Sequence, residues 1–233
     1  MSRQGTIIRR STMNIMQGLS SKTLMKLIRE IKKRSQTKKT DISDHLETLL
    51  LESLNIESKL IVELGAGDGE STFVLERVAN LWGAKLVSVD IEDRREVSGF
   101  KDRIFVHLDD ISFAAEFPDW CRKRGLEPII DILFIDTSHL YDHTAAEIRA
   151  WFPYLAQRCK VFFHDTNMGE VFVRKDGSTG KGWNNQRGVI QAIEEYLGAA
   201  FDEKTDFALE HRGWVIRHFT ICNGFMVMER GTF

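Results

Sequence analysis

The stretch Val62-Glu63-Leu64-Gly65-Ala66-Gly67-Asp68-Gly69 decides the fold of this chain. An apolar run precedes it at residues 60–62, and residues 71–81 after it have the pattern of a helix. A buried strand, a glycine turn and a helix N-terminus in this order form a site for a nucleotide-type cofactor. The glycines allow the backbone to approach a ligand closely and to take φ angles that a Cβ would forbid. The dinucleotide fingerprint G-x-G-x-x-G is excluded, because Glu70 stands where its third glycine would be.

The composition is that of one globular domain. The 233 residues are 42% hydrophobic and 28% charged, which allows a single domain of ordinary size with a substantial core. No apolar run has the length of a membrane span, and no apolar stretch with a cleavage site follows the N-terminal arginines, so we expect neither a membrane span nor a secretory signal. The three cysteines, Cys121, Cys159 and Cys222, are scattered and odd in number, which favours free thiols in a cytoplasmic protein.

Charge is distributed unevenly along the chain. Residues 1–40 contain 11 Lys and Arg and a single acid, whereas the remaining residues contain 21 basic and 33 acidic side chains. This asymmetry is compatible with an acidic partner such as a nucleic acid. However, apolar residues recur at helical spacing from Leu24 to Ile31, and no aromatic residue precedes Phe73. A basic helix with such a stripe more often packs on its own domain or on a second subunit. We therefore expect residues 1–57 to be a helical extension that caps the substrate site or contacts another copy of the chain.

After residue 57 the pattern changes to alternating strands and helices. Short apolar runs predict strands, and the longer segments between them predict helices, the clearest at residues 141–155. The predicted strands lie at residues 60–64, 86–89, 104–106, 132–135, 161–163, 207–210 and 219–228, the last interrupted by Asn223-Gly224. Almost wholly apolar strands that alternate with helices indicate a parallel sheet covered on both faces. We therefore expect an α/β, Rossmann-like doubly wound domain at residues 58–233, in which the glycine-rich residues 166–186 form an active-site loop.

Polar residues follow each predicted parallel strand, at the edge of the sheet where α/β proteins bind ligands. Asp90 ends the second strand, where a carboxylate can accept hydrogen bonds from both hydroxyls of a cofactor ribose; the alternative is a cap or turn residue. Asp110 follows the third strand, and its surroundings fit an adenine contact and an ordinary helix start equally well.

Asp136, His164 and Asp165 follow the fourth and fifth predicted strands, whose ends should be neighbours. Three such donors that converge at a cleft can hold a divalent cation, and two carboxylates without one would repel each other. The carboxylates favour Mg²⁺ or Mn²⁺. The alternative is that His164 and Asp165 only cap the strand and bond to loop amides.

Four segments carry a resemblance to a known family. They are residues 62–69, Val87-Ser88-Val89-Asp90, Phe134-Ile135-Asp136-Thr137-Ser138-His139-Leu140-Tyr141 and Phe163-His164-Asp165-Thr166. Together they resemble class I S-adenosylmethionine (AdoMet)-dependent methyltransferases, in particular the small-molecule O-methyltransferases of the methyltransferase 24 group, which includes proteins named cephalosporin hydroxylase. The resemblance covers residues 58–230. It implies a seven-stranded sheet with an antiparallel last strand, AdoMet as the methyl donor and, in several members, a bound Mg²⁺.

The resemblance also implies roles for individual residues. The residues expected to bind the cofactor are Glu63, Gly65, Ala66, Gly67, Ser71, Asp90, Asp110 and Asp136. Asp136 and Asp165, with His164 as a further ligand, are expected to hold the metal. His139 stands where catechol-type enzymes place a general-base lysine, and its ordinary pKa suits it to accept a proton from an acceptor hydroxyl at neutral pH. Two positions depart from the family pattern: Ser138 replaces an aspartate of many relatives, and His164-Asp165 replaces the Asp-Asn of catechol-type enzymes.

The acceptor is expected to be a small molecule with a hydroxyl group. Trp183, flanked by Asn184 and Asn185, is placed to stack on a sugar or an aromatic ring, although a packing role fits its sequence equally well. The predicted activity is transfer of a methyl group from AdoMet to this hydroxyl by a homo-oligomeric, cytoplasmic enzyme. Three alternatives stay open: a nucleic-acid methyltransferase with a basic arm, an AdoMet-binding protein without catalysis, and a hydroxylase whose iron is held by His139, His164 and an aspartate.

Overall fold

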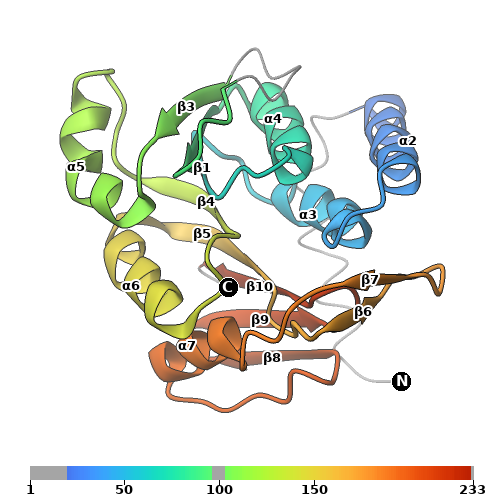
Figure 1. The fold of residues 1–233 in the computed structure, drawn as a ribbon. Helices are drawn as coiled ribbons and strands as arrows, with labels where there is room; N and C mark the ends of the chain where they lie inside the picture. The colour runs from blue at the N-terminus through green and yellow to red at the C-terminus, as the bar shows by residue number, and fades with distance from the viewer. Residues whose placement is uncertain (1–19, 96–102, 232–233) are drawn as a thin grey trace.

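A computed structural model describes residues 20–95 and 103–231 of the chain, and it shows a central mixed sheet with helices on both faces (Figure 1). The strands of the central sheet are β1 (Leu60–Leu64), β2 (Lys85–Asp90), β3 (Arg103–His107), β4 (Ile130–Ile135), β5 (Leu155–His164), β8 (Phe207–His211), β9 (Trp214–Phe219) and β10 (Phe225–Arg230). The α-helices are α2 (Ser21–Thr37), α3 (Leu46–Ser53), α4 (Glu70–Trp82), α5 (Asp110–Arg122), α6 (Tyr141–Trp151) and α7 (Gly188–Leu197). Two 3₁₀ turns, η2 (Ser43–His45) and η3 (Phe152–Tyr154), and a two-stranded hairpin of β6 (Val171–Val173) and β7 (Thr179–Lys181) complete the described elements.

The strand order is β3-β2-β1-β4-β5-β10-β9-β8. The strands from β3 to β5 are parallel, and the direction of winding reverses between β1 and β4. In a doubly wound sheet this reversal point opens a crevice beyond the carboxyl ends of the strands. The predicted Rossmann-like fold with an antiparallel last strand is confirmed, since β10 lies antiparallel between β5 and β9.

The C-terminal part of the sheet differs from the prediction in one respect. Residues 219–228 are not one interrupted strand, because Asn223-Gly224 belongs to a turn between β9 and β10 in which Cys222 and Gly224 take positive φ. A second tight turn at Arg212-Gly213, also with positive φ at both residues, joins β8 to β9. The central sheet therefore has eight strands rather than seven.

Three other boundaries also differ. The helix predicted over residues 141–155 ends at Trp151, η3 follows with Pro153 inside it, and Leu155 already belongs to β5. Helix α2 continues to Thr37, beyond the apolar spacing that ends at Ile31. The loop predicted at residues 166–186 contains the β6–β7 hairpin.

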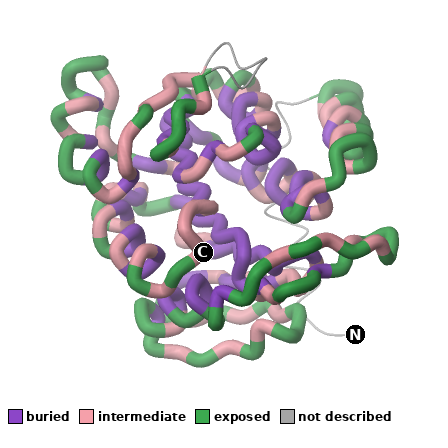
Figure 2. The backbone as a smooth tube through the Cα atoms, viewed as in Figure 1, coloured by how far each residue is buried: buried purple, intermediate pink, exposed green. Residues whose placement is uncertain are grey.

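Two hydrophobic clusters fill the two sides of the sheet (Figure 2). One contains Phe113, Trp151 and Ile190, which come from α5, α6 and α7. The other contains residues of α3 and α4 together with Ile31 of α2. The apolar stripe of α2 thus packs on its own domain. Residues 1–19 of the predicted extension lie outside the described residues, and within the described ranges no helix has the length and apolarity to cross a membrane.

Candidate active site

The glycine turn between β1 and α4 is shaped by close contact with the neighbouring strand. Gly65, Gly67 and Gly69 all have positive φ, a region that side chains with a Cβ rarely adopt. A Cβ on Gly65 would lie 1.8 Å from the carbonyl oxygen of Asp136, just after β4. Only glycine therefore fits at position 65, and the turn is held against the end of β4.

Glu63 lies beneath this turn, inside the domain. It is fully buried, and its carboxylate accepts hydrogen bonds from the hydroxyls of Ser71, Thr72 and Ser88. Burial raises the pKa of Glu63, although the three hydroxyls act in the opposite direction. Glu63 lines neither of the cavities at the turn. In this structure it fixes the first turn of α4 to β1 and β2, and its direct contact with the cofactor stays a prediction.

The other residues expected to bind the cofactor face a common cleft. A cavity of about 490 Å³ is lined by Gly65, Gly67, Asp90, Asp110 and Asp136, among others. A neighbouring cavity of about 250 Å³ is lined by the glycine turn with Ala66, Ser71, Asp136 and His139. The two cavities share Gly65, Gly67, Asp136 and Thr137, so they form one continuous groove over the reversal point of the sheet.

Asp90 occupies the position expected of a ribose-binding acid, at the end of β2. One carboxylate oxygen accepts hydrogen bonds from the backbone N–H groups of Ala66 and Gly67, at 3.0 and 3.1 Å, and the other accepts from the N–H of Glu92 at 2.8 Å. A carboxylate has about four acceptor sites. Asp90 therefore stabilises the glycine turn and keeps acceptor capacity toward the cleft.

The segment Thr40–Ile42 forms part of the wall of the smaller cavity, which the sequence did not indicate. Helix α2, which precedes it, is tied to α4 because Arg34 and Lys38 both pair with Glu70. Asp41 lines this cavity but is exposed at its surface. Partial desolvation raises its pKa, and the nearby Asp136 and Asp165 add to this effect, while His164 opposes it. The N-terminal region thus supplies a third carboxylate to this wall.

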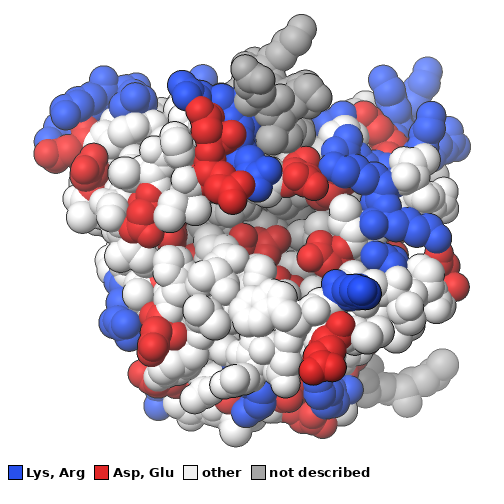
Figure 3. All heavy atoms as spheres, viewed as in Figure 1, with Lys and Arg blue, Asp and Glu red and all other residues white. Residues whose placement is uncertain are grey.

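Two histidines and two aspartates meet where β4 and β5 end side by side. Nε2 of His139 lies 3.1 Å from Oδ1 of Asp136 and 2.9 Å from Oδ2 of Asp165. Nδ1 of His164 lies 3.3 and 3.4 Å from the same two oxygens. His139 and Asp165 both have positive φ, at 59° and 58°, and such strained backbone is concentrated at functional sites. Acidic side chains gather in the hollow at the centre of the face drawn in Figure 3.

The charged groups of this cluster shift one another's pKa values. Burial opposes the ionisation of Asp136, but His164 and His139 outweigh it and hold the pKa of this carboxyl below its usual range. Burial also opposes the charged form of His139, yet Asp136 and Asp165 raise its pKa to about 10. His164 behaves likewise, because the two aspartates outweigh burial and raise its pKa well above the ordinary value. The ligand-free cluster is thus a mutually stabilised set of carboxylates and imidazolium ions.

The same cluster has the donor set of a cation site. Ligand atoms of Asp136, His139 and Asp165 all lie within 4.8 Å of one another. Oδ2 of Asp165 is buried beside Nε2 of His139 and Nδ1 of His164, at 2.9 and 3.4 Å, whereas Oδ1 is buried with no hydrogen-bond partner among the described residues. Buried acceptors without donors are uncommon in folded proteins. The residues present therefore fit a divalent cation. The set of ligand atoms that lie within 4.8 Å of one another contains His139 rather than the expected ligand His164, whose Nδ1 lies 3.3 and 3.4 Å from the two carboxylates.

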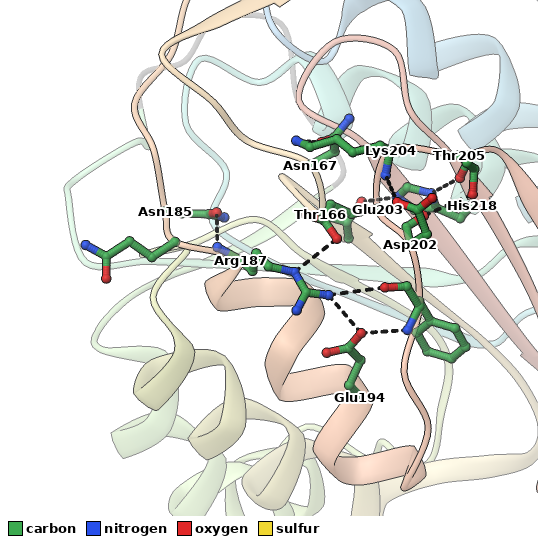
Figure 4. Close-up of polar contacts among 12 residues, drawn as sticks. Thr166, Asn167, Asn185, Arg187, Glu194, Asp202, Glu203, Lys204, Thr205 and His218 are labelled. Carbon is green, nitrogen blue, oxygen red and sulfur yellow. Dashed lines mark hydrogen bonds and ion pairs between the residues drawn. The ribbon is translucent and has the colours of Figure 1, made fainter.

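The segment that follows Asp165 is anchored rather than free (Figure 4). The side-chain amide of Asn185 donates to the backbone carbonyl of Asp165 at 2.9 Å, and its oxygen accepts from the N–H of Arg187. Thr166 bonds to Nε2 of His218 on β9. Arg187, just before α7, pairs with Glu194 of that helix. These contacts fix the conformation of Asp165 from both ends of residues 166–186.

Trp183 lies next to His139, with 5.8 Å between the ring centroids, and remains 43% exposed. With Asn184, Asn185 and Gln186 it lines a cavity of about 650 Å³ against the start of α6. An exposed aromatic ring surrounded by amide groups is suited to a polar ring-shaped ligand. The indole is therefore available to a ligand that reaches the histidine–aspartate cluster.

Comparison with known proteins agrees with this architecture. Residues 62–166 match a family model described as a methyltransferase domain. The fold is similar to that of an O-methyltransferase from Bacillus cereus in complex with SAH (S-adenosylhomocysteine), with 14% identity, 88% of this chain and 91% of that chain covered, and a TM-score of 0.54. It is also similar to an SAH-bound methyltransferase of Podospora anserina, with 11% identity, 100% and 98% coverage and a TM-score of 0.54.

A third similar structure is the MycE methyltransferase of the mycinamycin biosynthetic pathway, in complex with Mg, SAH and mycinamycin VI. The identity is 18% and the TM-score 0.55; the match covers 88% of this chain but 53% of MycE. A search of curated protein sequences found no significant match. At these identities the structures establish the shared fold, and the family model matches residues 62–166 as a methyltransferase domain.

Proposed function

We propose that this protein, in which residues 62–166 match a methyltransferase-domain model, uses AdoMet to methylate a hydroxyl group of a small molecule, such as a sugar or another natural product. One observation carries the proposal. The cluster of Asp136, His139 and Asp165 opens into the same groove as the glycine turn, so groups able to activate a hydroxyl lie next to the expected cofactor site.

The cofactor would lie along the groove, and each part of it would contact the residues that line the groove at that point. Gly65, Ala66 and Gly67 allow the donor to approach the backbone at the turn, and Ser71 lies beside them at the start of α4. Asp90 would accept hydrogen bonds from the ribose and Asp110 from the adenine amino group, at the other end of the groove. Glu63 would support the turn from below.

Asp136, Asp165 and His164 would hold a divalent cation, Mg²⁺ or Mn²⁺. When bound, AdoMet would supply the methyl group and the cation would lower the pKa of the acceptor hydroxyl. Support comes from the buried, unpartnered Oδ1 of Asp165 and from the donor types of the cluster. Because the cluster is built on the ends of two paired strands, β4 and β5, its geometry is fixed before a ligand arrives.

His139 would accept the proton of the acceptor hydroxyl at Nε2. With its pKa raised to about 10 by Asp136 and Asp165, this imidazole is already protonated at neutral pH in the ligand-free cluster. Neutralising the two carboxylates would return its pKa toward the ordinary value, at which histidine serves as a base. The base role and cation binding are therefore linked through the same two aspartates.

The acceptor would be walled by Trp183 and its neighbouring amides on one side and by Thr40–Ile42 on the other. The extension at residues 1–57 would then act as a cap on the site. Its apolar stripe packs on the domain and Arg34 is paired with Glu70, contacts that favour a packing role for α2 over the nucleic-acid alternative.

The decisive experiment uses AdoMet with an isotopically labelled methyl group and a panel of sugars, phenols and hydroxylated natural products. We expect SAH binding by calorimetry, and label found by mass spectrometry on an acceptor oxygen. Activity should fall after chelation and return with Mg²⁺ or Mn²⁺; activity indifferent to both would remove the cation from the mechanism. A protein that binds iron and does not bind SAH would instead support the hydroxylase alternative, because two imidazoles and two carboxylates are also ligands of non-haem iron.

A further inference from the structure

A second cluster of metal-ligating side chains lies beside the first. Asp110 stands at the start of α5, whereas His143 and Glu147 are four residues apart on α6. One ligand atom from each lies within 4.8 Å of the other two. Glu147 and His143 have no part in the reaction proposed above, and their proximity to Asp110 needs another explanation. Asp110 itself is assigned there to the adenine amino group, so a cation held by Asp110 would compete with that contact.

The polar contacts of this cluster are incomplete. Nε2 of His143 lies 3.0 Å from Oδ1 of Asp110 and 3.8 Å from Oε1 of Glu147. The hydroxyl of Thr137 donates to Oε1 of Glu147 at 2.7 Å. Asp110 is 7% exposed and Glu147 is 0% exposed, yet Oδ2 of Asp110 and Oε2 of Glu147 are buried without a hydrogen-bond partner in the described structure. A buried carboxylate oxygen without a donor destabilises the fold, so these two oxygens indicate a missing partner.

The ionisation of Glu147 is opposed by its surroundings in this cluster. Burial, and next the charge of Asp110, raise the pKa of Glu147 well above its ordinary value. Two buried carboxyl groups this close either share a proton or hold a cation between them. His143 adds a nitrogen donor, and the spacing of four residues places it on the same face of α6 as Glu147.

We propose that Asp110, His143 and Glu147 form a second cation site, separate from the cluster at Asp136 and Asp165. One imidazole and two carboxylates favour a transition-metal ion such as Mn²⁺ or Zn²⁺ over Ca²⁺, which prefers oxygen ligands alone. Asp110 and His143 line the 490 Å³ cleft, so an ion can enter from the groove. Thr137 bonds to Glu147 and directly follows Asp136, which joins the two sites through one residue.

The test is a metal titration that requires neither AdoMet nor an acceptor. The full chain is stripped with a chelator and titrated with Mn²⁺, followed by electron paramagnetic resonance and calorimetry, and then with Zn²⁺. Asp165→Asn removes the first cluster from the signal. In that background we expect Mn²⁺ binding to persist, and His143→Ala or Glu147→Gln to weaken it at least about tenfold.

Glu116→Gln on the exposed side of α5 is the matched control, since it makes the same chemical change away from the cluster, and it should leave Mn²⁺ affinity unaltered. His143→Ala and Glu147→Gln are also compared in the otherwise unsubstituted protein, so that the result does not depend on the folding of one variant. If neither substitution alters Mn²⁺ or Zn²⁺ binding, or if the Asp165→Asn protein binds no ion, the carboxyl pair holds only a shared proton and the proposal fails. Because no methyl transfer is measured, this outcome is independent of the proposed activity.

Discussion

His139 is the residue on which the proposed chemistry depends most directly. Its substitution by alanine should lower kcat by about 10²–10⁴-fold, the usual contribution of a positioned acid or base, while the affinity for SAH changes little because the ring lies beyond the glycine turn. Steady-state kinetics and calorimetry on the same preparations measure both quantities. His211→Ala on β8 is the control: its ring bonds to the carbonyl of Leu197, away from the groove, and kcat should be retained. Unchanged turnover in His139→Ala would rule out the base role.

Substitution of Gly65 tests how closely the glycine turn packs against the backbone that follows β4. Gly65→Ala places a methyl group 1.8 Å from the carbonyl oxygen of Asp136 and also forces alanine to positive φ. Gly83→Ala, at the end of α4, has the same strain in φ but no atom within 4 Å of the added carbon. We expect about 1–2 kcal/mol of destabilisation at Gly83 and a clearly larger loss, with loss of SAH binding, at Gly65. Equal urea midpoints for the two variants would contradict the close approach.

The residues of the acidic cluster were predictable because they follow parallel strands that had to be neighbours. The sequence placed Asp136, His164 and Asp165 together for that reason, and the structure brings them within hydrogen-bond range. The contacts of Glu63 were not predictable, because its position in a motif does not reveal the three hydroxyls that bond to it. The sequence favoured a cap within residues 1–57, but no local pattern shows that Asp41 lines the smaller cavity.

At the scale of elements, the contact between α2 and α4 makes acid stability depend on Glu70. Burial opposes its ionisation, but Arg34 and Lys38 outweigh burial and lower the pKa of Glu70. A carboxyl whose folded-state pKa is lowered adds stability above its unfolded pKa, near 4.5, and this stability is lost as the pH falls through the folded value.

Glu70→Gln should therefore be less stable than the wild type at pH 7, by on the order of 1 kcal/mol after allowance for solvent screening. The difference should shrink as the pH is lowered from 5 toward 3. Urea unfolding at a series of pH values measures it, with Glu116→Gln as the exposed control. A difference that is independent of pH would mean that the ion pairs with α2 contribute nothing.

Two kinds of element were predictable from the sequence: helices with a clear apolar stripe, and strands that are wholly apolar. Their hydrophobic pattern follows directly from burial on one face or on both faces. Strand β9 was not, since Arg217 and His218 interrupt its apolar pattern. In the structure its alternate residues Trp214, Ile216 and His218 are buried. The charge of Arg217 is compensated by Glu52 and Glu229, contacts from distant parts of the sequence that no window of neighbouring residues contains.

At the scale of the whole molecule, one buried ion network joins the first helices to the last strand. Lys160 of β5 is 1% exposed and pairs with Glu52 of α3 and Glu229 of β10. Lys160→Met leaves Glu52 and Glu229 with Arg217 as their shared partner, and loss of the two pairs made by Lys160 should cost about 1–3 kcal/mol. Lys32→Met removes an ammonium that is 54% exposed and pairs with Glu47, and should cost less than about 1 kcal/mol. Similar urea midpoints for the two variants would show that the network does not join these regions.

The position of β10 sets the order in which this protein can be completed during synthesis. β10 follows all the other strands along the chain, yet it lies between β5 and β9 and pairs Phe225 with His164. Until the ribosome has released these residues, the edge of β5 stays open and β8–β9 has no attachment to the sheet. Such late, long-range pairing is slow and exposes strand edges to other chains. His164 and Asp165 would therefore reach their final geometry only after translation has passed β10, and a nascent chain stalled before that point would hold the glycine turn without a formed acidic cluster.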